Sequence, residues 1–139
     1  MISCALESKF SLPNDEKIKT ELIGEWSTEK NTNEILRIEK NDDKTYKLIF
    51  VEKEKTEELI AFSKTINGFN IMNLITEYEG KVTNVFYGFN INGNALTYSE
   101  GNDKLRENNF DSETELLNFF KENVSKKGFF TNPVELRRK

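Results

Sequence analysis

The strongest constraint on the fold is the stretch from Lys44 to Ser99, which consists of short strand-like segments separated by turn residues. Aromatic and β-branched residues, which favour strands, are frequent in five segments: 45–51, 59–66, 69–74, 82–91 and 95–98. Turn-forming pairs separate several of them, namely Asn67-Gly68, Glu79-Gly80 and Asn92-Gly93. Because consecutive strands with short connections usually pair with each other, the sequence predicts an antiparallel up-and-down meander.

Three further elements flank this meander. Charged and apolar residues alternate over residues 34–40, which predicts another strand. Asn14 is a suitable N-cap for a short helix that would end near Leu22. A longer helix is predicted over residues 112–127, because Ser112 and Glu115 have the spacing of a capping box and an apolar stripe follows at helical spacing: Leu116, Phe119, Phe120 and Val124.

The chain of 139 residues is long enough for one domain with its own core. Closing the meander would remove its exposed edges, so we expect a mainly β fold, a barrel or half-barrel with one C-terminal α-helix. The helix would pack on the sheet or cover a barrel mouth. Residues 1–23 are interpreted as an N-terminal extension with a short helix. Residues 24–139 are interpreted as a single β domain that includes the helix at about 112–127.

Gly24-Glu25-Trp26 lies just before the first predicted strand of the sheet. This Gly-x-Trp sequence, followed by an antiparallel meander and a helix near the C-terminus, resembles the lipocalin (calycin) family. The resemblance implies that Trp26 plugs one end of a barrel. It also implies that an arginine packs over the indole, a role expected for Arg106 or, as the alternative, Arg137. Such a cation–π contact is worth ~1 kcal/mol and is structural rather than catalytic.

The order of several elements is also similar to that of small bacterial lipocalin-like proteins, many of them lipoproteins: Cys4, Leu12-Pro13, Leu22 to Trp26, residues 112–124 and residues 130–137. Ile2-Ser3-Cys4 resembles the end of a lipoprotein signal, although no basic and apolar segment precedes it in the chain as written. Two localisations follow. A native Met1 implies a cytoplasmic protein with an ordinary cysteine, whereas a removed signal peptide would make Cys4 the lipid anchor of a cell-envelope protein.

The composition argues against several classes of chemistry. The chain contains no histidine, the commonest general base and transition-metal ligand, and only one cysteine. It has no glycine-rich phosphate-binding loop, no calcium-loop spacing and no basic patch interleaved with aromatic residues. No segment is long and apolar enough to span a membrane. We therefore expect a protein that is not an enzyme, with no metal, no cofactor and no nucleic-acid partner.

The interior of the predicted barrel remains as the place for a function. The candidate ligand-binding residues are aromatic: Tyr46, Phe50, Phe62, Tyr78, Tyr87 and Phe89. Small barrels are often filled by side chains alone, which favours a filled or nearly filled core. The first functional interpretation is a lipocalin-like, non-enzymatic protein that binds a small hydrophobic molecule. The alternative is a protein-interaction module, envelope-associated or immunity-type, with a filled core and an exposed apolar or acidic patch.

Overall fold

The computed structural model describes residues 6–28, 34–102 and 110–139. The helical elements are η1 (Thr20–Leu22), a short 3-10 helix, and α1 (Glu113–Asn123). The strands are β1 (Glu7–Ser8), β2 (Gly24–Ser27), β3 (Glu34–Lys40), β4 (Tyr46–Glu52), β5 (Lys55–Ile66), β6 (Phe69–Tyr78), β7 (Lys81–Asn92), β8 (Ala95–Gly101) and β9 (Phe130–Arg138).

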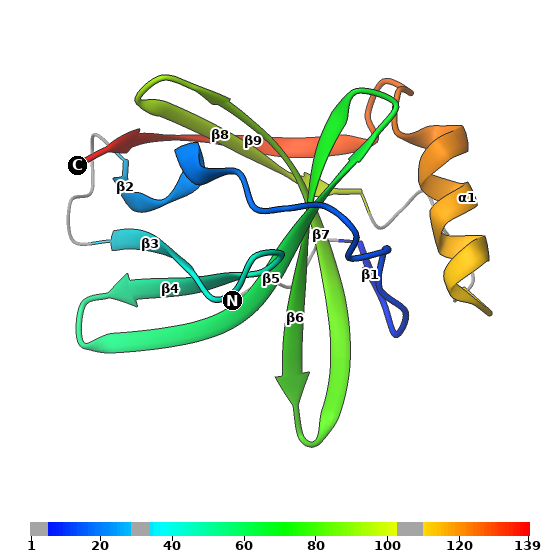
Figure 1. The fold of residues 1–139 in the computed structure, drawn as a ribbon, viewed down its shortest axis with the longest axis horizontal. Helices are drawn as coiled ribbons and strands as arrows, with labels where there is room; N and C mark the ends of the chain where they lie inside the picture. Colours follow the sequence, from blue (N-terminus) through cyan, green and yellow to red (C-terminus); the bar gives the residue numbers. More distant parts are fainter. Residues whose placement is uncertain (1–5, 29–33, 103–109) are drawn as a thin grey trace.

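The strands from β2 to β9 form a closed antiparallel barrel, as Figure 1 shows. Each of the strands β2 to β8 pairs with the next strand in the chain. Strand β9 also pairs with β2, so it lies between β8 and β2 in the ring. Closure occurs because β9 pairs with β8 on one side and with the end of β2 on the other, where Trp26 lies opposite Arg138. The predicted mainly β fold with one helix near the C-terminus is therefore confirmed. Because the ring of strands is closed, the fold is a barrel rather than a half-barrel.

Strand β9 was not predicted, because Pro133 interrupts its sequence and prolines are disfavoured within sheets. The structure accommodates this proline at an irregularity of the β8–β9 register, between the pairs Tyr98 with Val134 and Glu100 with Thr131. Asn132, the residue before it, has a positive φ of 54°. Proline has no backbone N–H, and at a bulge of this kind no ladder hydrogen bond is required from it. The strand can therefore continue beyond Pro133.

The predicted helix over residues 14–22 is wrong except for its last turn, η1. Tertiary hydrogen bonds hold this segment in an extended form instead. The backbone N–H of Ile18 donates to the carbonyl of Asp43, and that of Lys19 donates to the Tyr46 hydroxyl at 2.7 Å. The later helix is shorter than the predicted 112–127. It begins after Ser112, whose hydroxyl accepts a hydrogen bond from the Glu115 N–H, as the capping box predicts.

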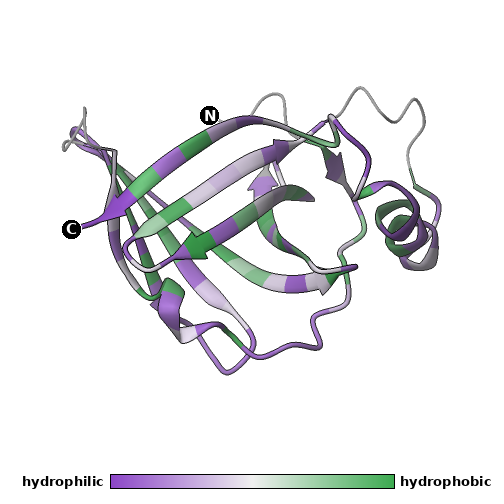
Figure 2. Cartoon of the chain, turned by 90° about the horizontal axis from the view of Figure 1, so that it is seen from above, coloured by the Kyte–Doolittle hydropathy of each residue, from purple (hydrophilic) through white to green (hydrophobic). Residues whose placement is uncertain are grey.

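The two faces of the barrel wall contact two separate hydrophobic cores. Hydrophobic and hydrophilic residues alternate along the strands, and α1 lies beside the barrel rather than over a mouth (Figure 2). The inner core lies inside the ring of strands and includes Trp26, Tyr46, Leu48, Leu74 and Phe89, among others. The outer core lies between the wall and α1 and contains Phe62, Ile71, Phe86, Leu116 and Phe120, among others.

Two buried asparagines attach the N-terminal segment to the outer face of the barrel. Asn73 on β6 donates to the side-chain carbonyl of Asn84 on β7 at 2.9 Å, and its own carbonyl accepts from the Leu12 N–H. Asn84 donates in turn to the carbonyl of Ser8. Because both side chains are buried and each of their nitrogen and oxygen atoms has a hydrogen-bond partner, they specify where the segment crosses the strands.

Trp26 closes one end of the barrel together with η1. Its indole is completely buried, and its N–H donates to the carbonyl of Leu22. The arginine that packs over the ring is Arg138, with its guanidinium carbon 4.3 Å from the ring centroid. The alternative Arg137 is wrong, because that side chain forms an exposed ion pair with Glu135. Arg106 lies outside the described residues.

Gly24 is required at this closed end. Its φ is +143°, and a Cβ atom there would lie 2.6 Å from a guanidinium nitrogen of Arg138. Any other residue at this position would combine backbone strain with a steric conflict against the arginine. The Gly-x-Trp spacing therefore has a local physical reason, because the glycine leaves room for the arginine that covers the tryptophan.

Candidate functional site

The barrel interior contains a cavity of about 270 Å³ that is partly open to solvent, so the interior is not completely filled. Of the expected filled or nearly filled core, the completely filled form is therefore wrong for this part of the barrel. Most of the lining is aliphatic or aromatic and comes from six barrel strands and η1, namely Leu22, Leu36, Ile38, Leu48, Phe50, Met72, Leu74, Tyr87, Phe89, Leu96, Tyr98 and Val134. The described part of the lining also includes Glu100 and Asn132. An apolar wall with a few polar groups is the usual composition of a small-molecule site.

The polar groups of the wall are clustered on three neighbouring strands, β7, β8 and β9. Tyr87 lies opposite Glu100 in the β7–β8 register, and Asn132 donates a long hydrogen bond of 3.3 Å to the Glu100 carboxylate. The rings of Tyr87 and Tyr98 make an edge-to-face contact with centroids 5.7 Å apart and planes at 73°. This arrangement places two phenols and one carboxylate on the same part of the cavity wall.

The hydroxyls of Tyr87 and Tyr98 form no hydrogen bond with any residue that the structure describes. Every buried polar side-chain atom in the same part of the chain has a partner. The two hydroxyls are therefore not sealed inside the protein, and both can reach solvent or a bound molecule. Buried tyrosines usually find a hydrogen-bond partner, so these two are available to a ligand.

The electrostatics of this wall keep both tyrosines neutral. Burial raises the pKa of Tyr87 above its ordinary value, and the nearby Glu100 carboxylate adds to the increase. Burial also raises the pKa of Tyr98, with further contributions from Glu34 and Glu100. A phenolate would be poorly solvated here and would be repelled by the carboxylates. Both side chains therefore present O–H donors rather than nucleophiles at neutral pH.

Three of the predicted ligand-binding residues line the cavity, Phe50, Tyr87 and Phe89. Tyr46 is inside the barrel but is absent from the lining, and its hydroxyl is within 3.1 Å of the Ser63 hydroxyl besides accepting from Lys19. It therefore has a structural role.

Phe62 was predicted on the wrong face. It lies in the outer core, because in β5 the inward position belongs to its neighbour Ala61, which packs in the inner core. The side chain of Tyr78 lies outside the described residues, as does Cys4.

Sequence reasoning missed the polar residues of the site, Tyr98, Glu100 and Asn132. The signal for Tyr98 was present, since Leu96 and Tyr98 alternate after the Asn92-Gly93 turn as inward-facing residues do. Glu100 and Asn132 carry no such signal. Both adjoin the irregular register between β8 and β9, and β9 was not recognised as a strand.

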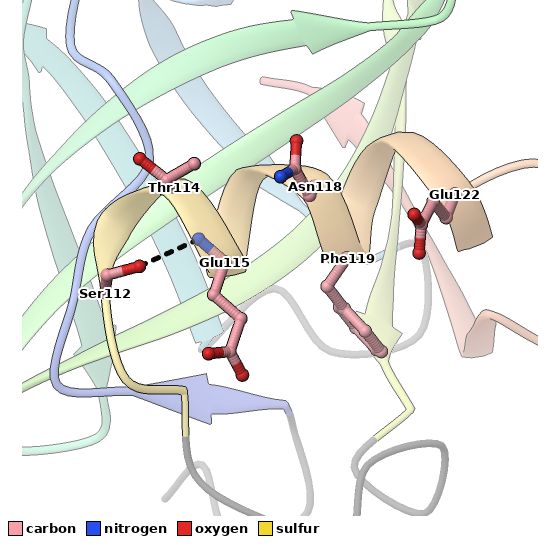
Figure 3. Close-up of a pocket in the computed structure, with 6 residues that line it drawn as sticks. All are labelled: Ser112, Thr114, Glu115, Asn118, Phe119 and Glu122. Carbon is pink, nitrogen blue, oxygen red and sulfur yellow. Dashed lines mark hydrogen bonds between the residues drawn. The ribbon is translucent and has the colours of Figure 1, made fainter.

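A second hollow, of about 370 Å³, is an open depression on the surface of α1 (Figure 3). Its lining comes from the polar face of the helix and its cap: Ser112, Thr114, Glu115, Asn118, Phe119 and Glu122. The backbone N–H of Glu115 already donates to the Ser112 hydroxyl, so it is not available to a ligand in the depression. Phe119 packs against the rings of Phe120 and Phe129. This depression is therefore helix surface rather than a binding site.

Within residues 6–28, 34–102 and 110–139, no three acidic or cysteine side chains are grouped as a metal site would require. None of the helices in these ranges is long and apolar enough to cross a membrane. Comparison of the chain with protein-family models, with curated proteins and with solved structures finds no match. The barrel cavity and its lining are the candidate functional site.

Proposed function

We propose that this protein is a lipocalin-like, non-enzymatic barrel that binds one small, mostly apolar molecule in its cavity. The observation that carries the proposal is the unfilled space of about 270 Å³ with an apolar wall and polar groups clustered on neighbouring strands. Cavities cost stability, because their lining atoms lack van der Waals partners. A ligand that fills this space would restore those contacts.

The size of the cavity limits the ligand. A dry protein cavity of about 150 Å³ accommodates benzene, and drug-sized molecules occupy roughly 300–1,000 Å³. By proportion, the cavity of about 270 Å³ suits a molecule of roughly ten non-hydrogen atoms, such as one ring with a short chain. Ligand efficiencies for molecules of this size give a dissociation constant between about 1 mM and about 1 µM.

The surface supports the alternative interaction module less well. Among the described residues, only two large apolar side chains are exposed, Phe69 at 39% and Val82 at 53%. Phe69 begins β6 and Val82 lies near the start of β7, so the length of β6 separates them. They form no contiguous apolar patch of the kind that marks a protein interface.

The test is a titration with phenylpropanol, a neutral molecule of the required size, followed by calorimetry and by NMR. We expect saturable one-site binding with shifts at cavity residues such as Leu74 and Phe89. The variant Val134→Phe places a ring in the cavity and should weaken binding at least ~10-fold, because the added volume displaces the ligand. The matched control is Val82→Phe, since Val82 is exposed outside the barrel and its enlargement should leave the affinity unchanged.

Absence of binding to phenylpropanol and to other neutral compounds of this size would contradict the proposal. So would equal loss of affinity in both phenylalanine variants, because the ligand would then not be in the barrel. Thermal unfolding of each variant shows whether the fold is intact before affinities are compared.

A further inference from the structure

We propose that the molecule bound in the cavity is a small amphipathic cation, an amine whose charged head contacts Glu100, Tyr87 and Tyr98 while its apolar part contacts the aliphatic wall. This inference rests on the proposed function and specifies the ligand class for the same site. It follows from three features of the lining residues that the structure describes, namely a carboxylate without a cationic partner among them, two aromatic rings beside it and no lysine or arginine in this part of the wall.

The carboxylate is Glu100, which contributes to the cavity wall from β8 and is partly buried. Its hydrogen-bond partner among the described residues is the amide of Asn132, at a long 3.3 Å. No lysine or arginine in that part of the chain forms an ion pair with it, whereas Glu25, Glu16 and Glu135 each have one. This carboxylate therefore has one long hydrogen bond to a neutral, exposed donor, and a cationic ligand in the cavity would give it a charged partner.

The aromatic faces come from Tyr87 and Tyr98. Their planes meet at 73°, so the two rings form two sides of a corner next to Glu100. Phe50 and Phe89 add further rings to the lining. Aromatic faces attract cations through their quadrupoles, and cages of such rings recognise organic ammonium groups. Two tyrosine rings beside one carboxylate therefore favour an ammonium head over a carboxylate or phosphate.

The charge of the lining supports the same conclusion. Among the fourteen described residues that line the cavity, Glu100 is the one charged residue, since this described part of the lining contains no lysine or arginine. Glu34, at the start of β3, lies close enough to Tyr98 to contribute to its raised pKa. Within the described part of the wall, an anionic ligand would meet the Glu100 carboxylate and no lysine or arginine, so like-charge repulsion would disfavour its binding.

The test compares three ligands of nearly equal shape: phenylpropylamine, which is cationic, phenylpropanol, which is neutral, and phenylpropionate, which is anionic. At neutral pH and low salt we expect the amine to bind at least ~10-fold more tightly than the alcohol, and the anion to bind most weakly. Glu100→Gln, which keeps the shape of the side chain, should reduce the preference for the amine to within ~3-fold. Glu135→Gln on the barrel exterior is the matched control and should leave the preference unchanged.

Glu100→Lys provides a second readout that a merely weakened fold would not produce. It should reverse the order, so that phenylpropionate binds more tightly than phenylpropylamine. Equal affinities for all three ligands, or tighter binding of the anion by the unmodified protein, would overturn the inference while the proposed binding function stands. Absence of binding by every member of the series would overturn both.

Discussion

Replacing Arg138 by methionine should destabilise the barrel, because one guanidinium joins three parts of its closed end. Arg138 donates to the carbonyl of Ile23 at 2.9 Å and to that of Glu21 at 2.7 Å. It also lies over the Trp26 ring at 4.3 Å. Methionine keeps a long apolar side chain but removes the charge and both hydrogen bonds. The backbone pairing of residue 138, whose N–H donates to Asn94, does not depend on the side chain.

The magnitude follows from these contacts. A hydrogen bond from a charged donor is worth about 1.5–3 kcal/mol, and we take the lower value for the half-buried bond to Ile23. The bond to Glu21 is exposed and is reduced to about 0.5 kcal/mol by solvent screening. A partly buried cation–π contact adds about 1 kcal/mol. The sum predicts a loss of about 3 kcal/mol, a large part of the 5–15 kcal/mol that typically stabilises a domain.

Urea denaturation followed by tryptophan fluorescence measures this loss directly. Trp26 is the single tryptophan and is completely buried, so its emission reports the closed end of the barrel. With a typical slope of about 2 kcal/mol per M, the midpoint of Arg138→Met should fall by about 1.5 M.

Arg137→Met is the matched control for this experiment. It removes a neighbouring arginine whose ion pair with Glu135 is half-exposed, and the expected change is below about 1 kcal/mol. A free energy of unfolding for Arg138→Met within about 0.5 kcal/mol of the unmodified protein would refute the reasoning, as would equal losses in the two variants.

Two further predictions concern buried polar groups. Asn73→Ala removes the hydrogen-bond partners of the Leu12 N–H and of the Asn84 side-chain carbonyl. We expect the free energy of unfolding to fall by about 2–4 kcal/mol and hydrogen exchange of backbone amides in the N-terminal segment to become faster. Unchanged exchange there would contradict the role of Asn73 as an attachment point. Burial raises the pKa of Tyr87 above its ordinary value of 10.0, so the folded state holds this proton more tightly than the unfolded state. The contribution of Tyr87 to the free energy of unfolding should therefore be fully present below about pH 10 and should be lost as the pH rises further. In denaturation curves measured at a series of alkaline pH values, Tyr87→Phe should make the fall of this free energy with pH less steep. An equally steep fall in the variant would show that other groups cause it.

Local sequence patterns were sufficient for most of the barrel strands and for the helix. The strands were recognisable because alternation and turn pairs such as Asn67-Gly68 are local properties, and the observed β5 and β6 meet at that pair. The N-cap of α1 was recognisable for the same reason, since Ser112 and Glu115 are three residues apart. The position of Gly24 and Trp26 at a barrel end was likewise expected from a short motif.

The cavity wall was predictable only in part. Phe50, Tyr87 and Phe89 are bulky residues on regular strands, and hydrophobicity alone suggests that they face inward. Phe62 has the same character, yet it faces α1, because this barrel has apolar cores on both sides of its wall. Period-two alternation shows which residues share a face, but it does not show which face is inside when both are buried.

The β meander and the capped helix could be predicted from the sequence, because these features depend on residues close together in the chain. Three features are visible only in the folded chain: the element that closes the barrel, the arginine that covers Trp26 and the groups that meet at the cavity. Strand β9 joins β2 across more than one hundred residues of chain, and the same pairing brings Arg138 to the indole. Glu100 and Tyr87 become neighbours through strand register alone. Long-range pairing of this kind depends on the packing of the whole chain, and no local pattern encodes it.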